Sequence, residues 1–350
     1  MAASFWQRRW KLILNIVTIV GLVGFAIAIR HDLMETLKNL GRVNAWWLLT
    51  LIPIEMMNYH AQARLYQRVF AVVGNVLSYK SLMRVTIELN FVNHVFPSAG
   101  AAGISYFGLR LKSATGGITA AKATLVHIIK LALTFLTYEV LLIVGMLSLA
   151  AINRVNGLVI LFGTAISILL IVATALFAHI VGSKARINRL FVGLTNVLNR
   201  IIHVFRPNSP ETINVSGVRD VFDDFHHNYK LLRSSIPRLH SSFWWAMVMN
   251  ATEILAIYVV FLAFGYTVNI GAIILAYGVA NFAGGISVLP GGVGVYEFLM
   301  TAVLATTGVP VAVSIPVIVM YRVVSTLIQV PPGYILYQRN LSRAGTGRAG

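Results

Sequence analysis

The sequence has no cysteine among its 350 residues, and it carries little charge. The absence of cysteine excludes a disulfide framework, a thiolate metal site, a cysteine nucleophile and a palmitoylation site. Only 11% of the residues are charged, whereas 57% are hydrophobic, and the mean hydropathy is +0.78. Because these values lie outside the range of soluble globular chains, the sequence predicts an integral membrane protein.

Acidic residues are especially scarce, since 11 Asp and Glu oppose 28 Lys and Arg and leave a net charge of +17. The cations stand in short stretches between long apolar runs and form no single stripe or arm, so we expect no nucleic-acid partner. This distribution is typical of the positive-inside bias of membrane proteins. The basic segments are therefore expected to face an anionic leaflet surface.

The first half of the chain contains four apolar runs that are candidates for membrane-spanning helices. Residues 12–29 are a candidate span, although Ala26-Ile27-Ala28 also resembles the cleavage site of a signal peptide. A second span is expected at about residues 43–59. The runs 125–152 and 158–181 predict a full out-and-back pair of helices.

Two further segments, 85–109 and 270–307, each consist of two short apolar arms around a break rich in proline and glycine. Each arm is short for a span, so a re-entrant helical hairpin is the simplest interpretation, although residues 270–289 are long enough to cross outright. With spans expected at 243–264 and 311–336, the sequence predicts an all-α polytopic membrane protein of about six full transmembrane helices plus two re-entrant hairpins. Hairpins that enter from opposite faces are typical of inverted repeats around a midplane site.

The predicted organisation is a single membrane domain, residues 1–350, with two halves. The first half covers 12–181, and a basic amphipathic connector at 182–242 leads to the second half at 243–337. Residues 338–350 are expected to form a disordered tail. Since the cations of the N-terminus, the connector and the tail should be inside, we expect a bacterial cytoplasmic (inner) membrane with both termini cytoplasmic.

Five of the acids fall inside or at the edge of hydrophobic segments: Glu55, Glu88, Glu139, Glu253 and Glu297. A charge at the bilayer centre costs at least about 2.5–3.5 kcal/mol on insertion scales, so these side chains should face the protein interior or a wet cavity. Candidate cationic partners are Lys130 and Arg322, and Arg322 is expected to pair with Glu297. The acids could also serve only to hold helices together, which is the alternative for each.

The two breaks read Phe96-Pro97-Ser98-Ala99-Gly100-Ala101-Ala102-Gly103 and Leu289-Pro290-Gly291-Gly292-Val293-Gly294-Val295-Tyr296-Glu297. Proline removes an amide donor and glycine permits close approach, so free N–H groups of the returning half-helix should point into the membrane. Such a helix end attracts anions and could hold a lipid phosphate. The alternative is that both breaks are turns or small-residue helix contacts. Neither has the pattern of a nucleotide loop, and no cofactor is expected.

The second break, followed by Gly308-Val309-Pro310 and Tyr321-Arg322, resembles the lysylphosphatidylglycerol synthase transmembrane region, the flippase-like domain family. Asn93-His94-Val95-Phe96-Pro97 with Gly100 and Gly103 is similar to the first-half break of that family, although Pro97-Ser98 replaces its Pro-Gly. The resemblance covers about residues 46–337. It implies translocation of a charged lipid, sometimes beside a soluble aminoacyl transferase domain, for which the polar connector is too short.

We therefore expect the protein to flip a phosphate-bearing lipid, anionic or aminoacylated, between leaflets, and not to act as an enzyme. The rivals are a membrane transferase that acts on a lipid-linked sugar or aminoacyl group with a partner-supplied donor domain, and a scaffold for envelope biogenesis. Besides the lipid, a second copy or an envelope enzyme is a candidate partner. The expected substrate-binding residues are Glu88, Asn93, Pro97, Gly100, Gly103, Lys130, Pro290, Gly291, Gly292, Gly294, Glu297, Tyr321 and Arg322, without a metal site.

Overall fold

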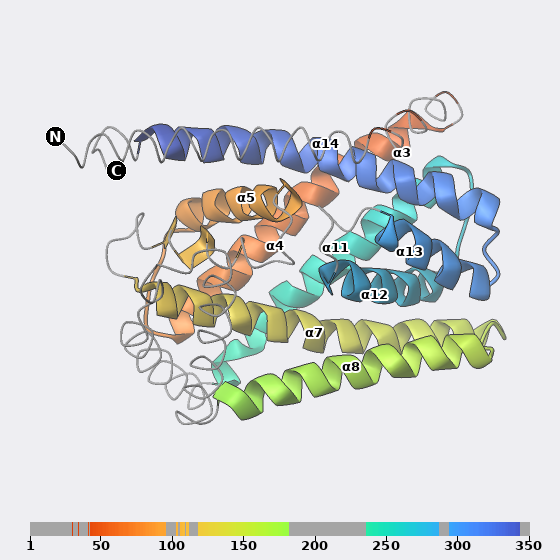
Figure 1. The fold of residues 1–350 in the computed structure, drawn as a ribbon, viewed down its shortest axis with the longest axis horizontal. Coiled ribbons are helices and arrows are strands. Elements are labelled where there is room, and N and C mark those ends of the chain that lie inside the picture. Colours follow the sequence, from red (N-terminus) through yellow and green to blue (C-terminus); the bar gives the residue numbers. More distant parts are fainter. Residues whose placement is uncertain are drawn as a thin grey trace, which may run out of the picture.

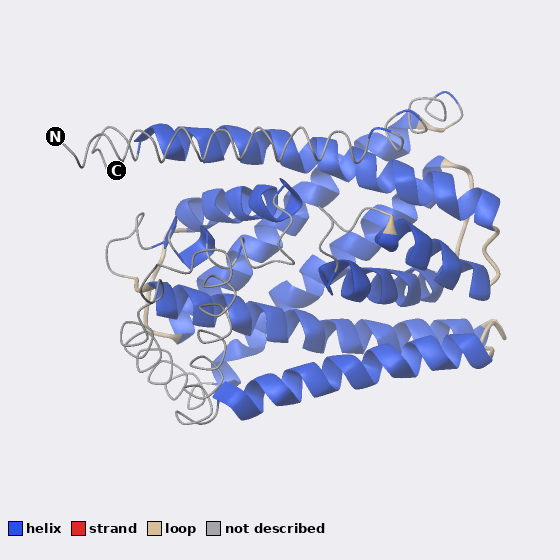
Figure 2. Ribbon diagram, in the orientation of Figure 1, coloured by secondary structure: helices blue, strands red, loops and turns tan. Residues whose placement is uncertain are grey.

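The computed structural model describes residues 43–95, 118–181, 236–286 and 294–343, together with residues 30, 34, 41, 103, 106–108, 110 and 111. In this part of the chain the regular structure is entirely helical (Figure 2). The helices, labelled as in Figure 1, are α3 (Ala45–Leu49), α4 (Leu51–Val72), α5 (Tyr79–Val95), α7 (Ala120–Ala151), α8 (Gly157–Val181), η2 (Ile236–Leu239), α11 (His240–Ala263), α12 (Ile270–Ile286), α13 (Val295–Thr306) and α14 (Val311–Arg343).

Four of the described helices are long and apolar enough to cross a membrane: α7, α8, α11 and α14. In α8 only 22% of the most apolar stretch is buried inside the protein, and large side chains such as Leu161 and Ile168 are exposed. A helix with so much apolar surface outside the protein needs a lipid solvent. The expected class, an all-α polytopic membrane protein, is therefore confirmed.

The second expected span, 43–59, differs from the structure. The short helix α3 ends at Leu49, and α4 then runs on to Val72. Helix α4 is not among the four spanning candidates of the described part because it carries many polar side chains, several of them buried. It packs against α11, α5 and α7 in the interior of the bundle, where polar groups can find protein partners (Figure 1). The first expected span, 12–29, lies outside the described residues.

The segment 270–307 has the geometry of a hairpin. Helices α12 and α13 have 17 and 12 residues, about 26 and 18 Å of helix, which is less than the roughly 30 Å of a hydrocarbon core. Its two outer ends meet, since Asn269 and Thr307 line one small cavity beside Arg154, and Asn156 Nδ2 donates to the Thr306 carbonyl at 2.7 Å. The segment therefore enters and leaves at the end of the bundle that holds the α7–α8 turn.

The first hairpin, expected at 85–109, begins earlier, because α5 starts at Tyr79. Of its second arm the structure describes only Gly103 and residues around Tyr106 to Leu111. Phe107 and Leu111 pack in one apolar cluster with Val73 and Ile118, next to the start of α7. The two hairpins thus open at opposite ends of α7, which agrees with the inverted-repeat prediction (Figure 1). The domain boundaries themselves stay a prediction.

Helix α14 corrects the expected tail, because it ends at Arg343 and not near Tyr337. The extra turns have packing partners: Tyr337 and Leu341 belong to an apolar cluster with Phe91 of α5. Gly333 allows this contact, since a Cβ there would collide with the side chain of Phe91. The expected amphipathic helix of the connector lies outside the described residues, which resume at η2, and α11 begins at His240 rather than Phe243.

Candidate functional site

A polar cavity of about 250 Å³ lies where α4, α5, α11, α12, α13 and α14 converge. Its wall is made mainly of side-chain amides, hydroxyls and two charged groups. The lining residues are Asn58, Gln62, Asn90, Asn93, His94, Glu253, Tyr277, Asn281, Tyr296, Tyr321, Arg322, Ser325, Thr326 and Gln329. Few pockets inside an apolar bundle gather so many hydrogen-bonding groups without a ligand to bind.

A second cavity of about 490 Å³ adjoins the first. The two share five lining residues: Gln62, Asn90, Asn93, Tyr277 and Asn281. The remaining wall of the second cavity is mostly apolar, from Leu89, Leu131, Phe135, Ile166, Leu170 and Phe282, but it also carries Lys130 and His127. A polar chamber and an apolar chamber therefore meet at a shared wall of amides and tyrosine.

Arg322 is the cation of the polar cavity, and its guanidinium pairs with Glu297 of α13, as the sequence predicts. Glu297 Oε2 also accepts from the N–H of Gly294 at 2.6 Å, the residue before the first turn of α13. Gly294 has φ +86°, which disfavours any residue with a Cβ. The Arg322 guanidinium lies 5.0 Å from the centre of the Tyr296 ring. The second break and the cavity cation are thus joined through one carboxylate.

Glu253 faces the polar cavity from α11, where its carboxylate accepts from Tyr321 Oη at 2.9 Å and from Asn58 Nδ2 at 3.1 Å. The Asn58 amide is itself fixed, since its Oδ1 accepts from Gln62 Nε2 at 2.6 Å. This chain of amides crosses from α4 to α11. It holds the carboxylate in one position before any ligand arrives.

Lys130 lies on α7 at the second cavity, one turn after His127. His127 Nδ1 is 2.8 Å from the hydroxyl of Tyr66, which orients the imidazole ring. Among the described lining residues, Arg322 is thus the only Lys or Arg of the polar chamber, and Lys130 is the only one of the apolar chamber.

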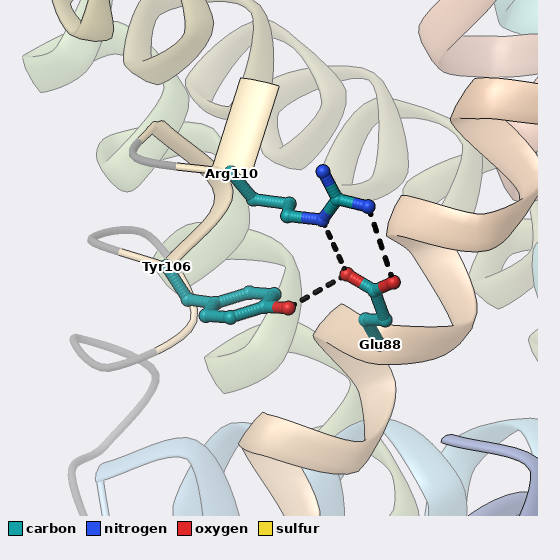
Figure 3. Close-up of polar contacts among 3 residues, drawn as sticks. All are labelled: Glu88, Tyr106 and Arg110. Atoms are coloured by element: carbon teal, nitrogen blue, oxygen red, sulfur yellow. Dashed lines mark hydrogen bonds and ion pairs between the residues drawn. The ribbon is translucent and has the colours of Figure 1, made fainter. Parts of the chain in front are cut away.

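Glu88 lies on α5, where it contacts the returning arm of the first hairpin. Its carboxylate accepts from Tyr106 Oη at 2.6 Å and from Arg110 Nε at 2.8 Å (Figure 3). Tyr106 and Arg110 belong to the returning arm of the first hairpin, so this ion pair closes the hairpin on α5. Glu88 does not line either of the two cavities. Its role in substrate binding stays a prediction.

The other predicted site residues divide into three groups. Asn93, Lys130, Tyr321 and Arg322 line the cavities, Glu297 pairs with Arg322, and Gly294 donates to Glu297. Gly103 packs against Asn93, because a Cβ there would collide with the Asn93 amide. The break residues Pro97, Gly100, Pro290, Gly291 and Gly292 lie outside the described residues.

Sequence reasoning missed Glu253 as a site residue, together with most of the amides of the cavity wall. Glu253 is one of the five acids expected to face the protein interior or a wet cavity, but it is not among the expected substrate-binding residues. A usable signal was present: Asn and Gln at positions 58, 62, 281 and 329 interrupt apolar helices and need buried partners.

Comparison with known proteins places the whole bundle in one family. The model of the family described as lysylphosphatidylglycerol synthase TM region matches residues 12–333. A UPF0104 membrane protein of Methanothermobacter thermautotrophicus is 27% identical over 188 residues. The matched stretch covers 52% of this chain and 52% of the relative, so it spans about half of that protein's length. A UPF0104 membrane protein of Pyrococcus horikoshii is 23% identical over 250 residues, or 71% of this chain and 74% of the relative.

Proposed function

Because the chain belongs to the lysylphosphatidylglycerol synthase transmembrane-region family, we propose that it moves a phosphate-bearing lipid, anionic or aminoacylated, between the leaflets of a bacterial cytoplasmic membrane. The observation that carries the proposal is the pair of adjoining cavities, one polar and one apolar. A lipid has the same division between headgroup and acyl chains. The account needs no cofactor, and the protein does not alter its substrate.

The polar cavity supplies the groups that a headgroup phosphate requires. Arg322 can donate to phosphate oxygens in a fork geometry, and the amides of Asn93 and Asn281 can donate beside it. Glu297 already forms an ion pair with the guanidinium of Arg322. An incoming phosphate must therefore share Arg322 with the Glu297 carboxylate or displace this carboxylate. For an aminoacylated headgroup, Glu297 becomes the partner of the ammonium group.

The apolar cavity accommodates the start of the acyl chains. Ile166 and Leu170 bring α8 to its wall, and the remainder of α8 exposes apolar side chains to the bilayer. Chains can therefore stay in or near the lipid phase while the headgroup crosses inside the protein, which avoids the large cost of moving a charge through hydrocarbon. Lys130, on this side, offers the phosphate a second cation along the same path.

The test is leaflet exchange by purified protein in liposomes that contain a trace of fluorescent anionic phospholipid. A membrane-impermeant quencher reports the fraction of the lipid in the outer leaflet over time. We expect faster exchange than in protein-free liposomes, and no new lipid by mass spectrometry. Absence of exchange contradicts the proposal.

The same samples separate the rival functions. A transferase would give a modified lipid only when an activated donor and its partner domain are added. A scaffold would give neither exchange nor product.

Lys130→Gln should slow exchange, because the glutamine keeps a polar side chain at the apolar cavity but removes its charge.

A further inference from the structure

The proposed transport path leaves two glutamates unused: Glu253 of α11, which lines the polar cavity, and Glu55 of α4, which is bonded to the cavity-lining residue Gln329. Asn58 brings the two near each other, because it lies one turn after Glu55 on α4 and donates to the Glu253 carboxylate at 3.1 Å. Glu55 is only 2% exposed, and its Oε2 accepts from Gln329 Nε2 at 2.8 Å. Within the described part of the chain, its other oxygen, Oε1, is buried and has no hydrogen-bond partner.

The partners of this pair are neutral groups. Glu55 contacts the amide of Gln329, and Glu253 contacts an amide and the hydroxyl of Tyr321. Among the described residues, Glu88 and Glu297 each have an arginine in ion-pair contact, whereas Glu55 and Glu253 have none. Two neighbouring carboxylates that are both ionised, without a cation in contact, repel each other, and burial strengthens the repulsion.

A single proton resolves both the repulsion and the unpartnered oxygen. The hydroxyl of Ser325 neighbours the Glu55 carboxyl and also lines the polar cavity. Its Oγ has no hydrogen-bond partner by distance and angle among the described residues. An O–H bond formed on Glu55 Oε1 could donate to a neighbouring oxygen such as this hydroxyl, and the proton would come from solvent that enters the polar cavity.

We propose that Glu55 and Glu253 form a proton-binding pair at the polar cavity, with Glu253 in its wall and Glu55 next to the wall residue Gln329, and that the pair holds one proton and exchanges it with solvent that enters the cavity. That the proton drives lipid movement rests on the proposed function. The structural link is Tyr321, which donates to Glu253 and directly precedes Arg322 in α14. Loss or gain of charge on Glu253 changes the strength of the hydrogen bond that Tyr321 donates to it. A shift of Tyr321 then moves the neighbouring guanidinium of Arg322.

The surroundings of the pair determine how it titrates. Among the residues that the structure describes, the titratable or charged groups that face the pair are Tyr59 of α4, His94 of α5, Lys130 of α7, Tyr277 of α12, Tyr296 of α13, and Tyr321 and Arg322 of α14.

Infrared difference spectroscopy on purified protein between acidic and alkaline pH tests the pair directly. We expect a carbonyl stretch of a protonated carboxyl group, shifted in heavy water, that Glu55→Gln and Glu253→Gln both lose. Glu139→Gln is the matched control, because Glu139 also has a buried carboxylate oxygen without a partner among the described residues but lines neither cavity. Absence of a component that both variants lose and the control keeps overturns the proposal.

Leaflet exchange measured across the same pH range tests the coupling. We expect the rate to depend on pH in wild type and Glu139→Gln, and this dependence to be lost in Glu55→Gln with an unchanged elution volume and melting temperature. Full pH dependence in Glu55→Gln overturns the coupling. If wild type shows the shared infrared component but exchanges no lipid, the proposed function fails and the proton-binding pair stands.

Discussion

Tyr321 and Arg322 are consecutive residues of α14, and their side chains bind carboxylates on two different helices. Tyr321 donates to Glu253 of α11, whereas Arg322 pairs with Glu297 at the start of α13. One turn of α14 therefore connects a central helix to the second break. A small displacement of α14 alters both contacts together, which gives a headgroup bound at Arg322 a mechanical connection to the bundle.

Loss of the Arg322 charge should stop transport while the protein remains folded. Arg322→Gln removes one partner of a largely buried ion pair, and the loss of such a pair costs up to about 3–5 kcal/mol of stability. Arg110→Gln is the matched control, because the Arg110–Glu88 pair is similarly buried, with side-chain exposures of 15% and 2% against 17% and 15% for Arg322–Glu297. We expect comparable losses of melting temperature in both variants, and loss of leaflet exchange only in Arg322→Gln.

An equal loss of exchange in the two arginine variants would contradict this assignment. It would mean that Arg322 acts through stability alone.

The first break should be coupled to the polar cavity through Gly103 and Asn93. Gly103→Ala places a methyl group against the Asn93 amide, and overpacking of this kind costs about 1–3 kcal/mol. Asn93→Ala removes the obstacle, so the double variant should recover stability, with a coupling energy in the range of about 0.5–3 kcal/mol. Thermal unfolding of the wild type, the two single variants and the double variant measures it.

Gly157→Ala serves as the reference for the effect of alanine itself, because a Cβ at Gly157 meets nothing within 4 Å. Its melting temperature should equal or slightly exceed that of wild type. If Gly103→Ala changes the melting temperature no more than Gly157→Ala does, then Gly103 does not pack closely on Asn93.

Cysteine labelling can test the topology cleanly, because the natural chain has no cysteine. The turns that contain Val155 and Thr267 lie at the same end of the bundle, where Arg154 and Thr267 line one cavity. We expect Val155→Cys and Thr267→Cys to react with an impermeant maleimide from outside the cell, and Ser209→Cys of the connector to react only after permeabilisation. Labelling of Ser209→Cys from outside would contradict the inverted-repeat scheme.

Much of the fold could be predicted from hydropathy, because a long apolar run must cross or lie in the membrane whatever its neighbours are. The hairpin of α12 and α13 and the Arg322–Glu297 pair followed from the same reasoning, since a deep cation needs a nearby anion. The nature of α4 could not be predicted so easily. Its polar side chains are tolerated only because surrounding helices bury them. A hydropathy profile describes one segment at a time and contains no information about the helices that pack around it.

The composition of the site was harder to predict for a related reason. Sequence gives the depth of a residue in the bilayer but not the direction in which it points. Glu88 and Glu253 are both intramembrane acids, yet one closes the first hairpin with Arg110 and the other faces the cavity. The choice depends on packing between helices that are distant in sequence, here α5 with its returning arm and α11 with α4 and α14.

Passage of lipid through the two adjoining cavities can be tested by blocking the wall that they share. Asn281 lines both chambers, and its side chain is accessible. Leaflet exchange by Asn281→Cys should be measured before and after reaction with a bulky maleimide, with Val155→Cys as the control. We expect modification to stop exchange in Asn281→Cys and to leave it unchanged in the control. Undiminished exchange through a fully modified Asn281→Cys protein would contradict it.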